Sequence, residues 1–179
     1  LAKHYGIAGF CYHHYWFGGH RLLERPFNAI LANPDIDLPF CLCWANENWT
    51  RRWDGMESDI LIAQNHSPED DIAFIADIAP ALRDSRYIRF QGRPILIVYR
   101  GSILPDARAT AERWRNYCRG AGIGAIYVIA ARSFGITDPR PSGFDAAVEF
   151  PPHNAPHTVL NHEVELLNQD FAGLVLDYN

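Results

Sequence analysis

Long apolar runs and positive charge are both in short supply in this sequence. None of its apolar stretches approaches the roughly 20 residues that a membrane-spanning helix needs, so no such helix is expected. The formal net charge is −5, and Lys3 is the single lysine among 16 basic residues. This charge balance gives no reason to expect nucleic acid or an anionic membrane as a partner.

Cysteine is also scarce. Four cysteines in 179 residues do not make the disulfide framework of a small secreted protein. Cys41 and Cys43 lie two positions apart on an expected strand and therefore share one face. We expect both to be small buried residues, and Cys11 and Cys118 to be buried as well. The pattern favours a reducing, cytoplasmic compartment; a signal peptide would precede Leu1 and lie outside this sequence.

Several motifs of catalysis and cofactor binding are missing. There is no G-x-S-x-G motif for a serine nucleophile. The glycines of residues 120–124 end an expected helix and lead into a strand, the reverse of a dinucleotide-binding fingerprint. His13 and His14 are adjacent, so on a strand they point to opposite faces, while His153 and His157 lie among prolines that forbid a regular helix. We expect neither a metal site nor a cofactor.

What the sequence does contain is an alternation of short apolar runs and helical segments. The expected strands occupy residues 7–12, 39–44, 94–99, 125–130, 146–150 and 173–176. The helical segments carry their own signals: Ser67 opens a capping box followed by Pro68, and apolar stripes run through residues 72–82 and 107–118. A third, short helix is expected near Pro26.

The spacing of these elements indicates the fold class. Strand starts lie mostly about thirty residues apart, which is typical of parallel βα units. Such units form a doubly wound open sheet or a (β/α)8 barrel, and the missing glycine fingerprint favours the barrel. Six strands are too few to close one, and the sequence begins in what reads as the last turn of a helix, residues 1–6. We therefore expect residues 1–179 to be a single α/β domain, the central part of a larger TIM-barrel-like catalytic domain.

The two ends of the expected strands differ in their chemistry. Aromatic rings, carboxylates, Arg and His stand at the C-terminal ends, at residues 12–17, 44–47, 99–100 and 149–153. The N-terminal ends of the strands lack this concentration of aromatic and charged residues, as at Pro39. Because barrel enzymes place the active site at the C-terminal ends of their strands, this asymmetry predicts an active-site face.

Residues 40–55, FCLCWANENWTRRWDG, concentrate this chemistry. Aromatic rings stack on sugars, Asn46 and Arg52 would hold hydroxyls or a phosphate, and a carboxyl group transfers protons, so the combination suggests a carbohydrate site. The alternative is a structural loop held down by its tryptophans. The expected substrate-binding residues are Tyr15, Trp16, Trp44, Asn46, Trp49, Arg52, Trp53, Tyr99 and His153.

Glu47 is the expected general acid or base. It follows Asn46 at a strand end, and the structural alternative is an ion pair with Arg51 or Arg52 that clamps the loop. Glu149 is the candidate for the second carboxylate of a two-carboxylate mechanism, in which the separation of the two groups decides between retention and inversion. A salt bridge to a neighbouring arginine explains Glu149 equally well.

Three segments, in order, resemble a known family. They are residues 6–19 (GIAGFCYHHYWFGG), residues 40–55, and residues 84–96, which contain DSRYI and GRPIL. Together they look like the WbsX-type glycosyltransferases of bacterial polysaccharide and O-antigen loci, and residues 144–152 also fit. The likeness extends from residue 1 to about residue 153.

That family is in turn similar to the endo-α-mannosidases, glycoside hydrolases that are (β/α)8 barrels. The resemblance implies two further strands before Leu1 in a complete member, and an acidic role for Glu47. The mannosidases carry Glu-Pro-Tyr-Glu at this strand end, whereas this sequence has Thr50 in place of the second Glu. The mannosidase mechanism therefore does not carry over intact.

Two functions follow from these observations. One is a glycosyltransferase or glycoside hydrolase-like enzyme acting on a bacterial surface polysaccharide, such as the O-antigen of lipopolysaccharide. Its substrate would be an oligosaccharide or polysaccharide, with a nucleotide sugar as donor if it transfers. The Asp-x-Asp of residues 35–37 falls in an expected helix-to-strand turn, which favours hydrolysis, whereas the family name favours transfer. The other function is that of a glycan-binding domain, which retains the sugar-binding cleft but has no catalytic activity.

Overall fold

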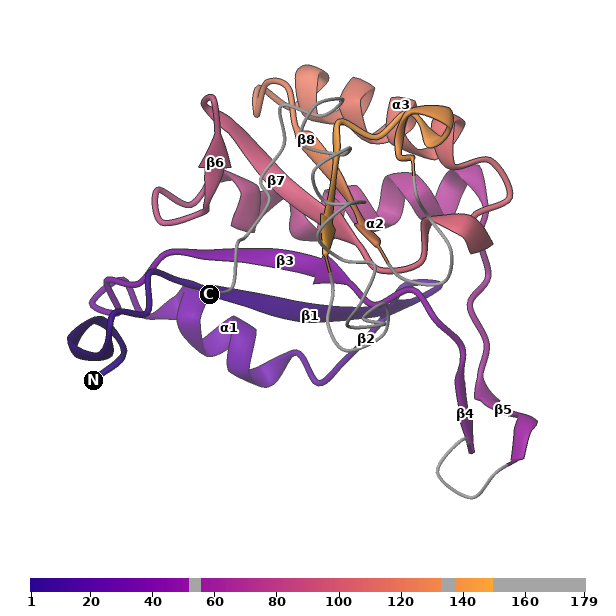
Figure 1. The fold of residues 1–179 in the computed structure, drawn as a ribbon, viewed down its shortest axis with the longest axis horizontal. Coiled ribbons are helices and arrows are strands. Elements are labelled where there is room, and N and C mark those ends of the chain that lie inside the picture. The colour runs from indigo at the N-terminus through magenta and orange to yellow at the C-terminus, as the bar shows by residue number, and fades with distance from the viewer. Residues whose placement is uncertain (52–55, 133–137, 150–179) are drawn as a thin grey trace, which may run out of the picture.

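The computed structural model describes residues 1–51, 56–132 and 138–149. They form one mostly parallel sheet with helices, and a separate two-stranded hairpin (Figure 1). The parallel strands are β1 (Phe10–Phe17), β3 (Phe40–Trp44), β7 (Arg93–Val98), β8 (Tyr127–Arg132) and β9 (Ala146–Glu149). Two short antiparallel strands are added to them, β2 (His20–Leu22) on β1 and β6 (Arg89–Phe90) on β7.

The connections between these strands hold the helices and the hairpin. The α-helices are α1 (Arg25–Ala32), α2 (Pro68–Arg83) and α3 (Ala107–Gly120). Short 3-10 turns lie at η1 (Ala2–Tyr5), η3 (Gly101–Ile103) and η4 (Arg140–Ser142). The hairpin of β4 (Trp49–Arg51) and β5 (Met56–Ile62) follows β3 and projects away from the body of the sheet (Figure 1).

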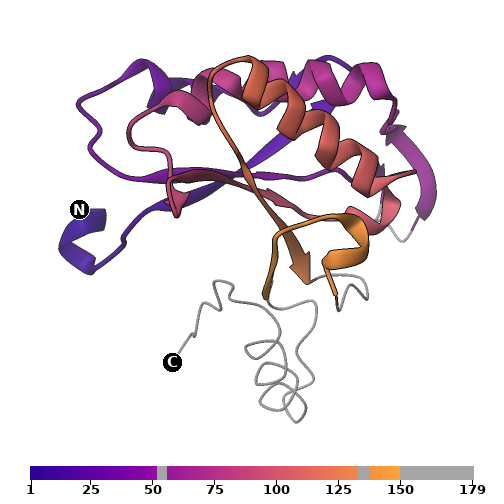
Figure 2. The ribbon, with the colours of Figure 1, turned by 90° about the horizontal axis from the view of Figure 1, so that it is seen from above.

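All three helices pack on the same face of the sheet, where Figure 2 shows α2 and α3 side by side. The ring of His14 contacts Phe27 of α1 and Phe74 of α2, with centroid distances of 6.5 and 5.8 Å. Trp114 of α3 contacts Trp44 of β3 at 5.6 Å. The parallel strands also follow one another in chain order across the sheet. A doubly wound sheet instead reverses its strand order and carries helices on both faces, so this arrangement favours a barrel segment, and barrel closure stays a prediction.

The core forms where apolar helix stripes meet buried strands. Every residue of β3 is buried, as expected of a strand covered on both faces. Trp44 stacks on Phe74 of α2 at 4.5 Å between ring centroids. The expected cap of α2 is confirmed, because Ser67 Oγ accepts a hydrogen bond from the Asp70 amide at 3.1 Å. Asp106 caps α3 in the same way through the Ala109 amide at 2.9 Å.

A buried tyrosine links β3 to β7 toward their N-terminal ends. The Tyr87 hydroxyl accepts a hydrogen bond from the Leu42 amide at 3.2 Å and donates one to the Ile95 carbonyl at 2.8 Å. The side chain is 2% exposed. Both polar roles of the hydroxyl are therefore satisfied inside the protein, as a buried tyrosine requires.

The α/β class and the parallel sheet that the sequence predicts are confirmed, and four of the expected strands lie within three residues of their predicted bounds. The first strand is wrong in position, because β1 runs from Phe10 to Phe17 and includes residues expected to follow it. Pairing with β2 holds this later half of β1 extended. The burial expected for Cys11 is also wrong, since its side chain is exposed. The expected strand at residues 173–176 lies outside the described residues.

Candidate active site at the strand ends

Asn46 joins the C-terminal ends of β3 and β7. Its side-chain Nδ2 donates to the carbonyl of Arg100 at 2.9 Å, and its Oδ1 accepts from the amide of Arg100 at 2.8 Å. One residue earlier, the Tyr99 amide donates to the Trp44 carbonyl at 3.0 Å. The side chain of Asn46 therefore continues the hydrogen bonding between β3 and β7 beyond the last backbone pair of the two strands. Its side chain is fully buried, so its amide binds protein rather than facing solvent as a hydroxyl-binding group would.

Arg100, held in this way, reaches Glu47. Its Nη1 lies 3.0 Å from Glu47 Oε1, and the two side chains are 28% and 29% exposed. The loop beyond Glu47 is fixed from the other side, because Asn48 Oδ1 accepts a hydrogen bond from the Gln64 amide at 2.7 Å. Arg51 forms an ion pair with Asp59, with Nη1 3.6 Å from Oδ2. Glu47 thus pairs with Arg100, which follows the neighbouring strand β7. In the sequence, Arg100 stood out only as one of the polar residues at a strand end.

Aromatic rings from β1, β4 and the end of β7 contact one another, and two of them, Trp49 and Tyr99, lie within two residues of Glu47 and Arg100 in the chain. We call Tyr15, Phe17, Trp49, His13 and Tyr99 the aromatic row. Trp49 meets Tyr15 and Phe17 edge to face, at centroid distances of 5.4 and 5.6 Å. His13 stacks on Tyr15 at 6.1 Å and meets Tyr99 at 6.3 Å. Because Tyr15 and Trp49 are only half-buried, part of each ring is open to solvent.

The aromatic row faces away from the helices. His13 and Tyr15 alternate along β1 with His14 and Trp16, whose rings contact Phe74 of α2, and alternate residues of a strand point to opposite faces. Burial raises the pKa of the Tyr15 hydroxyl above its ordinary value. This hydroxyl therefore remains protonated at neutral pH and can donate a hydrogen bond to a ligand.

The expected stacking residues Trp16 and Trp44 lie in the core instead. Trp16 is 5% exposed, and its indole Nε1 donates to Asp70 Oδ1 at 2.8 Å. Trp44 is fully buried between strand and helix, against Phe74 and Trp114. Neither ring faces solvent in the structure. The signal that separates them from Trp49 is position: both belong to the row of strand residues that faces the helices.

Glu149 forms an ion pair with Arg132, its partner by register on β8. The two side chains are 19% and 9% exposed. Strands β7 and β8 lie between β9, which carries Glu149, and β3, which Glu47 follows, so β9 and β3 are three strand spacings apart, about 14 Å along the sheet. Two-carboxylate glycosidases keep their carboxyl groups within roughly 10 Å. The described structure thus shows the salt bridge, and a catalytic role for Glu149 stays a prediction.

Three of the expected binding residues, Arg52, Trp53 and His153, lie outside the described residues. Among residues 1–51, 56–132 and 138–149, no group of three or more His, Cys, Asp or Glu side chains is arranged to hold a metal ion. Within the same ranges, no helix combines the length and the apolar character needed to cross a membrane.

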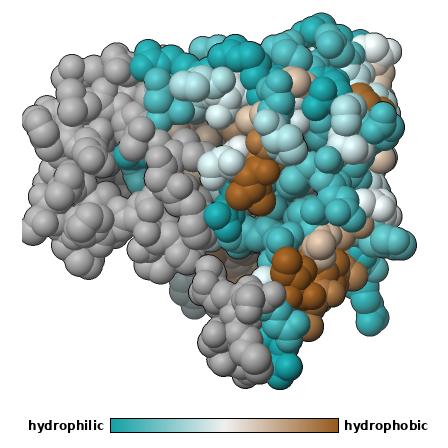
Figure 3. Space-filling view, turned by 90° about the vertical axis from the view of Figure 1, so that its right-hand side faces the viewer, coloured by the Kyte–Doolittle hydropathy of each residue, from teal (hydrophilic) through white to brown (hydrophobic). Residues whose placement is uncertain are grey.

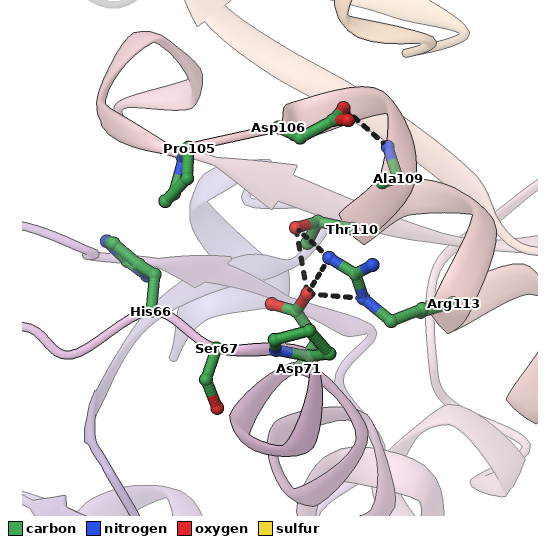
Figure 4. A pocket seen from close by; sticks show the side chains of 9 residues that line it. His66, Ser67, Asp71, Pro105, Asp106, Ala109, Thr110 and Arg113 are labelled. Atoms are coloured by element: carbon green, nitrogen blue, oxygen red, sulfur yellow. Dashed lines mark hydrogen bonds and ion pairs between the residues drawn. The ribbon is translucent and has the colours of Figure 1, made fainter.

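A pocket of about 240 Å³ lies between the N-terminal ends of α2 and α3 (Figure 4). Several of its polar groups bind one another, whereas Nδ1 and Nε2 of His66, which also lines the pocket, have no hydrogen-bond partner among the described residues. The buried Asp71 carboxylate accepts from Thr110 Oγ1 at 2.9 Å and from Arg113 Nε at 2.7 Å. The helix ends themselves are capped by Ser67 and Asp106. The guanidinium group of Arg113 in this pocket is thus already paired with Asp71, and we assign the candidate site to Glu47 and the aromatic row.

The β4–β5 hairpin adds apolar surface beyond the candidate site. Ile60 and Leu61 of β5 are 50% and 52% exposed. Figure 3 shows the molecule from the side toward which the hairpin projects, with apolar surface near the lower edge of the view. Trp49 of the same hairpin belongs to the aromatic row, so the hairpin connects this surface to the strand ends.

Comparison with known proteins gives a family and a set of relatives. Residues 1–177 match the family described as Glycosyltransferase WbsX. The uncharacterized protein WxcX, from two strains of Xanthomonas campestris pv. campestris, is 51% and 50% identical to this chain over 178 residues. Each alignment covers 99% of this chain and 26% of WxcX. The chain therefore spans about a quarter of the length of the curated relatives it matches.

One solved structure, that of a glycoside hydrolase-like protein, is similar with a TM-score of 0.53. The similarity covers 92% of this chain and 52% of that chain, at 16% sequence identity. At this identity the likeness concerns the fold.

Proposed function

Because this chain belongs to the WbsX family of glycosyltransferases, we propose that it forms part of a carbohydrate-active enzyme in which Glu47 is the general acid or base. The observation that supports this proposal is the position of the Glu47 carboxylate, held at 3.0 Å by Arg100 beside the C-terminal ends of parallel strands. Enzymes built from βα units gather their reacting groups at this edge.

Arg100 and Asn46 act as positioning residues in this proposal. Asn46 fixes the backbone of Arg100, and the guanidinium group of Arg100 fixes one oxygen of the Glu47 carboxylate. A general acid or base must stand within hydrogen-bond reach of the proton that it moves. In hydrolysis, protonated Glu47 would give its proton to the leaving glycosidic oxygen. In transfer, ionised Glu47 would take the proton of the acceptor hydroxyl as that oxygen attacks the anomeric carbon.

The aromatic row would bind the sugar rings. Trp49, two residues after Glu47 in the chain, and Tyr15, which it contacts, are partly exposed, and an aromatic face stacks on the apolar face of a pyranose. The Tyr15 hydroxyl supplies a donor for a sugar hydroxyl. Tyr99 and His13 support these rings from the sheet. We retain Arg52, Trp53 and His153 as further contacts expected from the sequence.

The substrate we propose is a bacterial surface polysaccharide or its oligosaccharide precursor, such as the O-antigen of lipopolysaccharide, with a nucleotide sugar as donor if the reaction is transfer. This choice rests on the family description. The Asp35–Asp37 pair lies between α1 and β3, at the opposite ends of the strands from Glu47, and Asp37 forms an ion pair with Lys3. It is therefore badly placed to serve a diphosphate at the site. Four free cysteines support a cytoplasmic, reducing location.

The test uses the complete protein as wild type and as Glu47→Gln, with Glu112→Gln on the exposed side of α3 as the control. Each protein is incubated with bacterial glycans, with and without nucleotide sugars, and the products are identified by mass spectrometry. Shortened glycans without a donor indicate a hydrolase, and extended glycans that require a donor indicate a transferase. Full activity of Glu47→Gln would contradict the assignment of Glu47.

A glycan-binding domain without catalysis is the second candidate. The ion pair of Glu47 with Arg100 supports it, because this pair would also hold a purely structural carboxylate. Under this alternative no product forms, Glu47→Gln binds glycans as the wild type does, and Trp49→Ala loses affinity. Isothermal titration of the same glycans on the two variants separates the candidates.

A further inference from the structure

Three cysteines gather on β1 and β3, on the face of the sheet that also carries the aromatic row. Cys11 pairs in register with Cys41, and His13 pairs in register with Cys43. In-register residues of parallel strands point to the same side, and every second residue of a strand shares that side. The three thiols and the His13 ring therefore lie on one face, and Cys11 and Cys41 are each the second residue of their strands.

The spacing of the two strands suits a disulfide. Neighbouring strands lie about 4.8 Å apart, and the Cα atoms of a disulfide are separated by roughly 4.4–6.8 Å. Cys11 and Cys41 occupy directly opposite positions, so their sulfur atoms can meet without a change of strand register. Cys43 is displaced from Cys11 by two positions along β3.

The thiols differ in access and in proton affinity. Cys11 is exposed, whereas Cys41 and Cys43 are 4% and 0% exposed. Hydrogen bonds from the thiols of Cys41 and, second, Cys43 hold the pKa of Cys11 below its ordinary value, and His13 acts in the same direction. The pKa of Cys41 is raised, because its thiol binds the Cys11 sulfur and is buried. The exposed sulfur is thus the nucleophile, and its buried neighbour keeps a proton.

We propose that Cys11 and Cys41 form a peroxide-sensitive thiol pair that closes to a disulfide between β1 and β3. In the first step the Cys11 thiolate attacks one oxygen of a hydroperoxide, the O–O bond breaks, and Cys11 becomes a sulfenic acid while hydroxide or alkoxide leaves. In the second step the Cys41 sulfur attacks the Cys11 sulfur, water leaves with the Cys41 proton, and the disulfide forms. The peroxide is reduced by two electrons and the two thiols are oxidised.

The consequence for the fold is a covalent link between β1, which carries Tyr15, and β3, which Glu47 follows. The link would lie below the aromatic row, toward the N-terminal ends of the strands, and would leave Glu47 and Arg100 in place. This proposal is independent of the reaction that Glu47 performs. It assigns a modification site to residues that the proposed function does not use.

The experiment exposes the complete, reduced protein to a small excess of hydrogen peroxide and then blocks the remaining thiols with iodoacetamide. Trypsin leaves Cys11 in peptide 4–21 and both β3 cysteines in peptide 22–51. The expected product joins these two peptides with the loss of two hydrogens. Fragment ions on either side of Leu42 must place the link at Cys41; a link at Cys43, or no link, would overturn the proposal.

Cys118 is the internal control. It is buried in α3, and burial raises its pKa to about 11, so it should react with peroxide at least about ten-fold more slowly than Cys11. Equal rates at the two sites would contradict the proposal. In Cys41→Ala the sulfenic acid of Cys11 should persist and be trapped by dimedone, whereas in Cys118→Ala the disulfide should form as in the wild type. If Cys41→Ala yields no dimedone adduct at Cys11, although its circular dichroism matches that of the wild type, the result would also contradict the proposal.

Discussion

Asn46 binds Arg100 through both polar atoms of its side-chain amide, at 2.9 Å to the carbonyl and 2.8 Å to the backbone amide. A buried asparagine thus stands where the next residue pair of the sheet would otherwise be. The same contact determines where the guanidinium group that holds Glu47 can lie. One residue therefore contributes both to the stability of the strand ends and to the geometry of the candidate site.

Replacing Asn46 tests this double role. Asn46→Ala leaves the amide and the carbonyl of Arg100 without these partners in a buried setting, and we expect a loss of about 1–3 kcal/mol in the free energy of unfolding. Urea denaturation measures it. Asn116→Ala, at an exposed position of α3, should stay within about 0.5 kcal/mol of the wild type. An Asn46→Ala protein as stable as the control would show that the contact contributes little.

Replacing Arg100 separates geometry from stability. Arg100→Lys keeps the charge but loses the planar guanidinium group, so kcat should fall about ten-fold as Glu47 loses its fixed orientation, an effect of roughly 1.4 kcal/mol. Because both side chains are partly exposed, the free energy of unfolding should change by less than about 1 kcal/mol. Steady-state kinetics with Arg119→Lys as the matched control checks the prediction. Unchanged kcat in Arg100→Lys would remove Arg100 from the site.

The same substitution at Glu47 and at Glu149 separates the two roles of Glu149. We expect Glu47→Gln to abolish turnover. Glu149→Gln should abolish it too if Glu149 is the second catalytic carboxylate, and should retain most of it if Glu149 only pairs with Arg132, three strands away from β3. The measurement is product formation at saturating substrate. Loss of activity in both variants, with native circular dichroism, would identify Glu149 as the second catalytic carboxylate.

Tyr87→Phe should destabilise the sheet. The substitution removes the hydroxyl that joins the Leu42 amide to the Ile95 carbonyl in a buried position, and a loss of about 1–3 kcal/mol is expected. Tyr5→Phe, at a position 72% exposed, is the control and should change little. Thermal unfolding of both variants gives the comparison, and equal midpoints would contradict the role assigned to Tyr87.

His66 should make the protein less stable as the pH falls. Burial lowers the pKa of His66 in the folded protein, and this outweighs the opposing effect of Asp71 and Asp70. Below the ordinary histidine pKa of about 6.5 the unfolded chain therefore binds more protons than the folded one, so stability decreases with falling pH. Between pH 7.5 and pH 5.5 the urea midpoint of the wild type should fall more than that of His66→Gln. His4→Gln, at an exposed position, should follow the wild type.

Some of these features could be predicted from residues alone because they depend on short-range chemistry. The Ser67 cap of α2 and the left-handed Gly6 after the first helical turn follow from local sequence, and both are present. The buried strand at residues 40–44 follows from its consecutive apolar residues, since only a strand covered on both faces is apolar throughout. Neither Asp106 as the cap of α3 nor the β4–β5 hairpin was predicted, although Asp106 is a residue type that favours helix caps.

The sequence by itself determined the α/β class, the order of strands and helices, and the segment where aromatic and acidic residues meet. These features follow from periodicity and composition, which reflect interactions between residues close in the chain. Only the tertiary structure decided which tryptophans are buried, that Asn46 binds Arg100, and that Arg100 rather than Arg51 holds Glu47. The two contacts of Arg100 join residues more than fifty positions apart. All of these features depend on which strands become neighbours and which face each side chain takes.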